Sequence, residues 1–599
     1  MNLLKTALSI AVVSIASIAG AATYNFVSTD GDYGTAANWQ DANLANGVPT
    51  TGDTAYVRNG GVVSITASQA ALALQFGKSN IDPNTLIDSA LAGSGVMAAG
   101  TQTLTLGSLK IGDTQAGSFL QQGGTVTMSS FELSSNVSAN LTVNAGVFSS
   151  SASSPGMLVN KNATFNLTGG SVFSSGSGGR GLTTGTVTGA TNAINFSGGT
   201  FQTNGGFRTN NTTGGTTNMT ISNDALVVLK ADSQLGYGSS SGSANSNYST
   251  LTMTGGSLLA AVQPATWDSA TYRLEIAARS KAQLNMENGF AAVGQLRMGN
   301  GASSPGGTLY QTGGSFWCSS VDMRMQAFDE SAAGEPDAGT KIIVNGGVFM
   351  ANKPGGSGGD NIIGDQGAAS FEVGLNGTAI MDAIQMGKNA TSNSSLSISG
   401  NGYLQLGRGL YTANADAIRA FNFTGGTVDM RNLGNNWTDP NGTYVGSPDG
   451  IDDIYATAWN GVDLKNDGGL LTLLPGVRLA VNVGSSTLAD DFVMTAGTWD
   501  IDVTGAGLAD WANILNGQAS LTGGLLNPIL VGYTPTLNEP FTIAKGTSPA
   551  VVSGMSVSDP AHWQVQANGN NVELVYIPEP ATMSLLVLGG LAMLRRRRN

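Results

Sequence analysis

The stretch Leu251-Thr-Met-Thr-Gly-Gly-Ser-Leu258 contains the pattern that decides the fold of this 599-residue chain. Apolar and polar residues alternate on both sides of a glycine doublet, and each flank is only a few residues long. Alternation with period two predicts short β-strands, and the doublet predicts a tight corner because glycine tolerates positive φ. The pattern recurs at 120–128, 165–173, 194–201, 309–316, 342–349 and 421–428, with weaker copies at Ala145-Gly146, Asn376-Gly377 and Asn401-Gly402.

The spacing of these copies is typical of a solenoid. Successive second glycines lie 22 to 33 residues apart, except for two gaps of about twice that length. One such coil cannot bury its own apolar row, so we expect coils to stack with like residues ~4.8 Å apart. The frequent glycines argue against a helical solenoid, since each costs a helix about 1 kcal/mol relative to alanine. We therefore predict an all-β, right-handed parallel β-helix (β-solenoid), with a β-propeller or tandem sandwiches as the alternative.

The ends of such a solenoid need covers, because an open coil exposes unpaired strand edges. Bulky residues such as Trp39 suit 23–66 to an N-terminal cap, and solenoid repeats are predicted over 67–497. Residues 498–576 contain more Trp and Pro and a strand-turn pattern, which predicts a C-terminal β cap. The remaining segments, 1–22 and 577–599, have the character of targeting sequences.

Composition excludes several classes of site. The chain has one histidine, His562, and one cysteine, Cys318, so zinc sites with several His ligands and intrachain disulfides are impossible. The net charge of −13 argues against binding nucleic acid through phosphates. Hydrophobic residues make up 41% of the chain, which suffices for a core. No cofactor is expected.

The N-terminus reads as a secretory signal. Lys5 supplies the positive start, 7–19 form the apolar core, and Ala19-Gly20-Ala21 is a small-residue cleavage site. The mature protein is therefore expected to begin near Ala22 or Thr23.

The C-terminus has three parts: Pro578-Glu579-Pro580, the apolar run 581–594, and Arg595-Arg596-Arg597-Arg598 before the final Asn. Fourteen helical residues span about 21 Å, less than the ~30 Å hydrocarbon core of a bilayer, so the transmembrane helix expected here is a short anchor. The arginines should stay on the cytoplasmic side, with the bulk of the chain exported. Removing both targeting segments changes the net charge from −13 to −17 for residues 23–577.

This tail resembles the PEP-CTERM sorting signal of Gram-negative bacteria. The resemblance implies a partner, an exosortase-type membrane protease, and transient anchoring in the inner membrane before the protein reaches the outer surface or the extracellular matrix. It also implies a host that makes extracellular polysaccharide. The same type of tail is called an ice-binding-protein C-terminal motif, a label that does not itself imply ice binding.

The body is similar to proteins with autotransporter-associated β-strand repeats. Asn38-Trp39, Pro49, Asp53-Thr54-Ala55 and Gly60-Gly61-Val62 look like their opening, and 521–525 through 540–543 look like their closing module. The resemblance implies a β-helical passenger at the cell surface, often adhesive.

Carboxylates are the main candidates for chemistry, because β-helices host polysaccharide lyases and glycosidases. A lyase needs calcium-binding aspartates with a basic residue, and a glycosidase needs two carboxylates about 5–10 Å apart. Three groups are candidates, each with a plainer interpretation as a solvated loop, cap face or turn: Asp449, Asp452 and Asp453 with Asp463 and Asp467 nearby; Asp500 and Asp502; and Asp30 and Asp32.

The remaining candidates favour structural roles. His562 is interpreted as a cap or surface histidine, and Cys318 as a buried free thiol that packs as a small hydrophobe. Thr-x-Thr patterns at Thr101, Thr103, Thr105, Thr125 and Thr127 suggest an ice-binding ladder, but they do not recur at every coil.

Two functional hypotheses result. The first is an exported, non-catalytic cell-surface or matrix protein whose Asn, Ser and Thr flanks contact polysaccharide or neighbouring cells. The second is a polysaccharide lyase or glycoside hydrolase that uses the acidic loop at Asp449–Asp453, with or without calcium.

Overall fold

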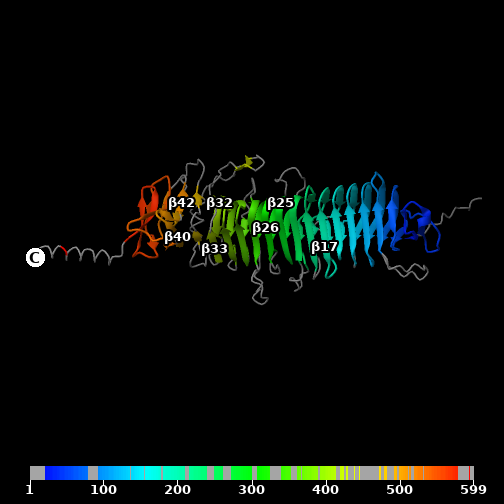
Figure 1. The fold of residues 1–599 in the computed structure, drawn as a ribbon, viewed down its shortest axis with the longest axis horizontal. Coiled ribbons are helices and arrows are strands. Elements are labelled where there is room, and N and C mark those ends of the chain that lie inside the picture. Colours follow the sequence, from blue (N-terminus) through cyan, green and yellow to red (C-terminus); the bar gives the residue numbers. More distant parts are fainter. Residues whose placement is uncertain are drawn as a thin grey trace, which may run out of the picture.

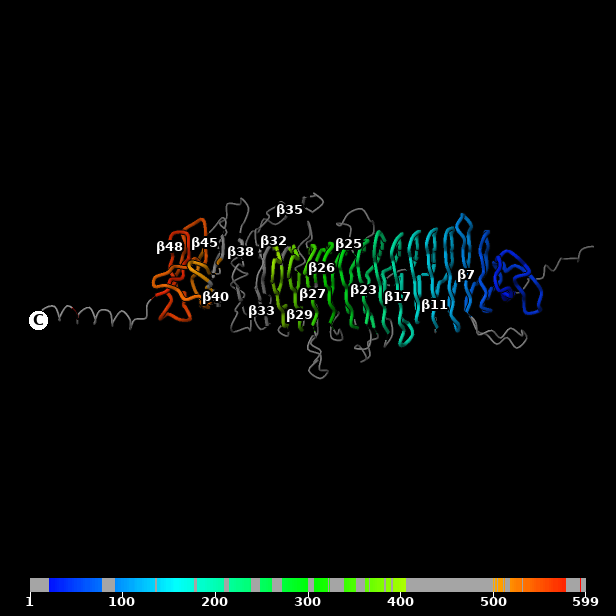
Figure 2. The backbone as a smooth tube through the Cα atoms, viewed as in Figure 1, coloured from blue at the N-terminus to red at the C-terminus, as the bar shows by residue number. Residues whose placement is uncertain are grey.

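The chain forms a long rod of stacked β-strands, shown by a computed structural model (Figure 1). The colours change steadily along the rod from the blue N-terminal end to the red C-terminal end, so successive coils stack in sequence order (Figure 2). The model describes residues 21–577 and Met593, and between 413 and 497 it describes only the backbone of the strands. Elsewhere within 21–577 it leaves out 78–91, 135–136, 154, 177–179, 210–214, 239–247, 261–271, 279, 300–305, 324–338, 352–360, 366, 389–391, 510, 515–517 and 531.

Three stacks of parallel strands build the rod; the described coils from β5 (Val62–Ile65) to β32 (Tyr403–Thr412) contribute to all three, and those after β32 to the first and second. The first stack precedes each glycine corner. It contains β2 (Asp30–Asp32), β5 (Val62–Ile65), β7 (Gly93–Met97), β9 (Gly117–Gln121), β11 (Ala139–Val143), β14 (Ala163–Leu167), β17 (Thr191–Phe196), β20 (Thr216–Ile221), the first parts of β23 (Tyr248–Leu259), β25 (Lys281–Met298), β26 (Gly307–Met323) and β27 (Thr340–Ala351), and β29 (Ala368–Val373), β31 (Asn393–Ile398), β33 (Ile418–Phe423), β37 (Leu471–Leu473), β40 (Thr498–Gly505), β44 (Leu525–Leu530) and β47 (Ser556–Val557).

The second stack follows the corner and uses the middle or end of the long strands β23, β25, β26 and β27. It also contains the first parts of β6 (Gln69–Phe76), β8 (Thr103–Ile111), β10 (Thr125–Leu133), β30 (Thr378–Met386) and β32 (Tyr403–Thr412), and all of β12 (Val147–Ser150), β15 (Ser171–Ser174), β18 (Thr200–Thr203), β21 (Leu226–Leu229), β34 (Thr427–Asp429), β38 (Arg478–Val481), β42 (Trp511–Ile514) and β45 (Pro540–Lys545).

The third stack closes each coil. It contains β1 (Thr23–Phe26), β4 (Thr54–Val57), the ends of β6, β8, β10, β25, β26, β30 and β32, and β13 (Met157–Val159), β16 (Leu182–Thr184), β19 (Phe207–Arg208), β22 (Ser233–Leu235), β24 (Arg273–Ile276) and β28 (Asn361–Ile363). The predicted parallel β-solenoid is therefore confirmed.

The core is a set of axial rows, because every strand turns alternate residues inward and equivalent positions align from coil to coil. In the first stack, one buried row consists of Phe119, Leu141, Phe165, Ile194, Met219, Leu251, Leu284, Leu309, Ile342, Phe371 and Leu396. Such rows bury continuous apolar surface although each coil alone is thin.

The glycine corners behave as predicted at most copies. The second glycine has positive φ in the strong copies whose backbone is described, at Gly124, Gly170, Gly199, Gly256, Gly314 and Gly347, and also at Gly146. The expectation is wrong at the other two weak copies. There the bonds Gly377 N–H to Gly374 O and Gly402 N–H to Ser399 O close four-residue turns, and positive φ moves to Leu375 and Gly400.

Replacing Gly170 with Ala is expected to lower the free energy of unfolding by roughly 1–3 kcal/mol. Its φ is +71°, and an added Cβ would lie 2.5 Å from the carbonyl oxygen of Gly146 on the preceding coil. Denaturant unfolding of residues 22–577 measures the effect. Gly569→Ala is the matched control, since φ there is +58° but nothing lies near the added Cβ; equal losses in both variants would contradict the stacking argument.

The two ends depart from the parallel pattern. At the N-terminal end, β1 pairs antiparallel with β3 (Trp39–Gln40) after the short 3-10 turn η1 (Ala36–Asn38), but β1 and β2 also pair in parallel with β4 and β5. The parallel stacking thus begins within 23–66. At the other end, β45, β49 (Asn571–Tyr576) and β48 (Trp563–Asn568) form an antiparallel sheet. The shorter elements are β35 (Trp437–Thr438), β36 (Tyr444–Val445), β39 (Phe492–Met494), β41 (Leu508–Ala509), β43 (Ala519–Leu521) and β46 (Val551–Val552).

Candidate functional surface

The outward side of the first stack carries two axial rows of amide and hydroxyl side chains, which we call the first face. It is outward because these residues alternate with the buried row described above. One row contains Ser118, Asn140, Thr164, Ala193, Asn218, Thr250, Gln283 and Thr308, and the other contains Leu120, Thr142, Asn166, Asn195, Thr220, Thr252, Asn285 and Tyr310. Ala193 and Leu120 are apolar interruptions of these rows.

Hydrogen bonds along these rows link neighbouring coils. Asn195 Nδ2 donates to Asn166 Oδ1 at 2.9 Å, and Asn166 Nδ2 donates to Asn140 Oδ1 at 3.2 Å. Farther along, Asn285 Nδ2 donates to Thr252 Oγ1 at 3.4 Å. Each amide or hydroxyl can both donate and accept, so groups not used within a row are available to a bound molecule.

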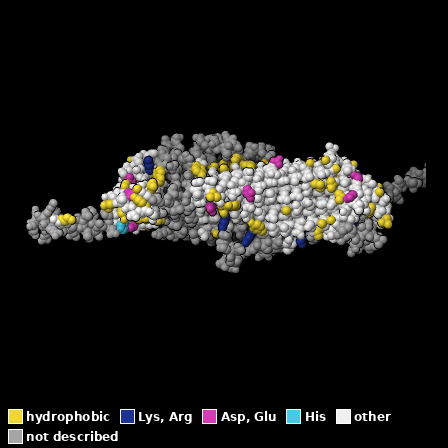
Figure 3. Space-filling model, in the orientation of Figure 1, with side chains coloured by type: hydrophobic (Ala, Val, Ile, Leu, Met, Phe, Trp, Pro, Cys, Tyr) yellow, Lys and Arg dark blue, Asp and Glu magenta, His cyan; other side chains and the backbone are white. Residues whose placement is uncertain are grey.

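Two exposed tyrosines lie on the first face. Tyr310 is 36% exposed and follows Asn285 in register, and Tyr248 is 39% exposed, with its hydroxyl 2.6 Å from Gln283 Oε1. Large exposed aromatic rings of this kind offer apolar faces beside hydrogen-bonding groups. From Ser118 to Tyr310 the two rows contain no Lys, Arg, Asp or Glu. Tyr248 lies beside these rows and pairs in register with Lys281, and Lys341 follows Thr308 on the next coil. Charged side chains are few on the face seen in Figure 3.

The third stack carries two groups of paired charged side chains. In β8 and β10, Lys110 Nζ lies 2.9 Å from Asp113 Oδ1 and 3.3 Å from Glu132 Oε2, and Asn160 donates to the other oxygen of Glu132. Partial burial by itself would lower the pKa of Lys110. The hydrogen bond that Lys110 donates to Asp113 and the charge of Glu132 outweigh burial, so the pKa of Lys110 lies above its ordinary value. The Lys110 ammonium stays charged below that pKa, so raising the pH removes its charge only in strongly alkaline solution.

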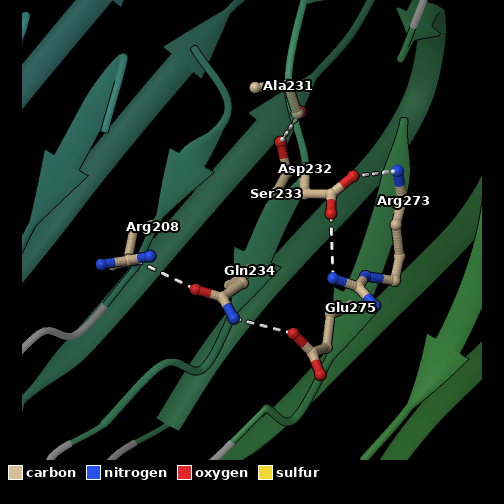
Figure 4. A network of polar contacts seen from close by, with 7 residues as sticks. All are labelled: Arg208, Ala231, Asp232, Ser233, Gln234, Arg273 and Glu275. Atoms are coloured by element: carbon tan, nitrogen blue, oxygen red, sulfur yellow. Dashed lines mark hydrogen bonds and ion pairs between the residues drawn. The ribbon is translucent and has the colours of Figure 1, made fainter. Parts of the chain in front are cut away.

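A second charged group spans three coils (Figure 4). Arg208 Nε donates to Gln234 Oε1 at 3.0 Å, and Gln234 Nε2 donates to Glu275 Oε2 at 2.8 Å. Beside them, Arg273 pairs with Asp232 through both its backbone N–H and its guanidinium. Glu275 is buried, and its Oε1 has no hydrogen-bond partner among the residues that the structure describes. This arrangement ties neighbouring coils together.

Asp32 closes a turn. Its Oδ1 accepts the N–H of Gly34 at 2.8 Å, its Oδ2 accepts the hydroxyl of Thr66, and Asp30 pairs with Val62 on the next coil. The plainer interpretation as a turn therefore holds for Asp32, whereas Asp30 is the first residue of strand β2.

The other carboxylate candidates are less fully seen. Asp500 and Asp502 alternate along β40 with the buried residues Trp499, Ile501 and Val503. Their side chains lie outside the part of the chain that the structure describes. So do Asp449, Asp452, Asp453, Asp463 and Asp467, as well as Ala19 and all residues of the sorting motif.

His562 belongs to the C-terminal cap. Its Nδ1 lies 2.7 Å from Asp559 Oδ2, and its ring stacks on Tyr576 with centroids 6.0 Å apart. Its backbone carbonyl accepts the N–H of Ile577, the last described residue before the sorting motif. These contacts confirm a cap histidine.

Cys318 is a buried free thiol, as predicted. Burial raises its pKa far above the ordinary value, so the reactive thiolate is scarce even in mildly alkaline solution. We expect no reaction with Ellman's reagent in the folded protein at pH 8 and complete reaction in denaturant. Labelling of the folded protein at the denatured rate would contradict this placement.

The Thr-x-Thr pattern forms no continuous ladder. Thr103 and Thr105 lie beside Thr125 and Thr127, but the next coil has Val147 and Ser149 at these positions, and Thr101 precedes the strand. The ladder is therefore two coils long.

Sequence reasoning missed the two tyrosines of the first face. The sequence indicates that Tyr310 points outward, since it alternates with the apolar residues of its strand. Which residues lie beside the two tyrosines on adjacent coils depends on loop lengths that the sequence does not mark. Within the described ranges, no group of three His, Cys, Asp or Glu side chains is placed to hold a metal ion. In the same ranges no helix is long and apolar enough to cross a membrane; the run 581–594 falls outside them, Met593 excepted. No protein-family model, curated protein or solved structure matches this chain.

Proposed function

We propose that this chain is an exported, non-catalytic cell-surface or extracellular-matrix protein that is sorted through its PEP-CTERM-like tail and contacts polysaccharide through the first face. The observation that carries the contact is the exposed Tyr310 in two uncharged rows of mostly amide and hydroxyl side chains, with the exposed Tyr248 beside them. The sorting partner is an exosortase-type protease that acts on Pro578-Glu579-Pro580 and the arginines at 595–598.

The chemistry of the first face suits an uncharged, extended glycan. Sugar rings present apolar faces that stack on aromatic side chains, and their hydroxyls pair with groups that both donate and accept. The coil repeat of ~4.8 Å is comparable with the length of one sugar ring in an extended chain, so a polymer lying along the rod meets an uncharged polar side chain at most of its rings. The net charge of −17 for residues 23–577 disfavours a strongly acidic polymer.

The test is co-sedimentation of residues 22–577 with extracellular polysaccharide from the producing bacterium, with the molar mass of the polymer followed in the same tubes. Binding without shortening supports the proposal. Shortening of the polymer would support the lyase or hydrolase hypothesis, and Asp452→Asn would then be the next variant. Neither binding nor shortening would contradict the polysaccharide contact and direct attention to adhesion between cells.

The double variant Tyr248→Ala, Tyr310→Ala is expected to weaken binding by roughly tenfold or more, from two stacking contacts of about 0.5–1.5 kcal/mol each. Tyr310→Phe should retain most of the affinity because the ring remains. Leu72→Ala is the control, since Leu72 is 46% exposed on β6, away from this face. Equal binding by the double variant and the parent protein would place the contact elsewhere.

A further inference from the structure

The backbone nitrogen of Ala22 is held by a carboxylate at the N-terminal end of the solenoid. Ala22 N donates to Asp53 Oδ1 at 2.9 Å, and Ala22 O accepts the N–H of Thr54 at 2.9 Å. The other oxygen of Asp53 is taken by Thr50, whose N–H and hydroxyl lie 2.9 and 2.7 Å away. Asp53 therefore faces Ala22 with one oxygen and is fixed in place by a turn through the other.

From this geometry we infer that signal cleavage falls between Ala21 and Ala22, and that the new α-ammonium of Ala22 forms an ion pair with Asp53. In the precursor this nitrogen is a neutral amide. After hydrolysis of the Ala21–Ala22 bond, with water adding to the new carboxyl and amino ends, it is an amine that is protonated at neutral pH. A charge-assisted hydrogen bond is roughly twice as strong as a neutral one.

The pairing distinguishes this bond from its neighbours. Cleavage one residue later would start the chain at Thr23 and remove both hydrogen bonds of Ala22. Cleavage after Ala19 would leave Gly20 and Ala21 ahead of a nitrogen that stays neutral. Only a chain that starts at Ala22 keeps both bonds and places a positive charge against Asp53. The surroundings of Asp53 favour its charged form. Burial alone would raise the pKa of this carboxyl, but its hydrogen bonds with Thr50 and Ala22 outweigh burial and lower the pKa.

The consequence is that the ion pair holds the first strand of the rod, β1, in place. β1 pairs with β4 from Thr23 and Thr54 onward, directly beside the proposed ion pair. End strands of a sheet fray and recruit other chains unless they are tied down. Because the charge exists only after cleavage, the ion pair forms in the processed chain and not in the precursor.

This inference rests on the export step of the proposed function, so the first experiment separates the two. The full-length precursor is expressed in a Gram-negative host, and the N-terminus of the exported protein is read by mass spectrometry. A start at Ala22 is the expected result. A start at Thr23 or Gly20 overturns the inference and leaves export intact, whereas an uncleaved chain retained in the cell overturns both.

The second experiment measures the ion pair itself. Amide hydrogen exchange is followed at Thr54 in chains that start at Ala22 and at Gly20, each with and without Asp53→Asn. We expect the substitution to accelerate exchange roughly three- to tenfold more in the chain that starts at Ala22. Asp41→Asn is the matched control, because Asp41 also closes a turn, through Asn43 and Ala45; it should act equally in both chains. Equal effects of Asp53→Asn in the two chains would overturn the ion pair.

Discussion

Replacing Phe349 with alanine is expected to lower the free energy of unfolding by about 3–5 kcal/mol, the usual loss for a buried aromatic side chain. Phe349 is fully buried and stacks on Phe316 of the preceding coil, with ring centroids 5.5 Å apart and planes 5° from parallel. Its other edge meets Phe371 of the next coil at 5.5 Å. The substitution therefore removes contacts with two neighbouring coils and leaves a cavity between them.

The loss should be local, because each coil of a solenoid contacts only its neighbours. Denaturant unfolding measures its size, and hydrogen exchange should show lost protection in β26, β27 and β29 while β9 and β11 keep theirs. Leu72→Ala, at an exposed position, is the control and should change stability by less than about 0.5 kcal/mol. Uniform loss of protection along the whole rod would contradict the stacked-coil description.

Much of this fold could be predicted because short stretches of the sequence specify its repeat. The glycine doublet needs positive φ, and its flanks alternate, so corners, strands and buried rows follow from short stretches such as 251–258. Prediction failed where a different turn does the same work. At Leu375 and Gly400 a four-residue turn replaces the doublet, and the sequence Asn-Gly there gave no sign that the left-handed residue would precede it.

For the candidate surface, the sequence predicted the type of side chain but not which side chains lie next to each other. An excess of Asn, Ser and Thr predicts a polar flank. The alignment of Thr142, Asn166 and Asn195, however, requires the register of coils whose lengths differ. The pairing of Arg208, Gln234 and Glu275 likewise joins coils separated by long, irregular connections. Loop closure depends weakly on loop length, so sequence spacing carries little information about such neighbours.

The ends of the rod are stabilised by different contacts from its middle, as the surroundings of Trp39 show. Trp39 is fully buried, its Nε1 donates to Tyr33 O at 2.9 Å, and its ring meets Phe26 and Tyr33 edge-on at about 5 Å. It thereby holds together β1, β3 and the turn before η1. A coil in mid-rod is held from both sides, whereas within the described residues, which start at 21, this group has stacked coils on one side only.

Trp39→Ala is therefore expected to cost about 3–5 kcal/mol locally and to open the N-terminal end of the solenoid. Exchange protection should be lost across β1 and β4 and kept in β27. The freed edge of β4 then presents unpaired backbone groups, so we also expect concentration-dependent association in sedimentation velocity. Trp39→Phe keeps the ring packing and loses only the hydrogen bond, so it should stay monomer-like relative to the alanine variant. An alanine variant with full protection in β1 and no added association would show that Trp39 is not what closes this end.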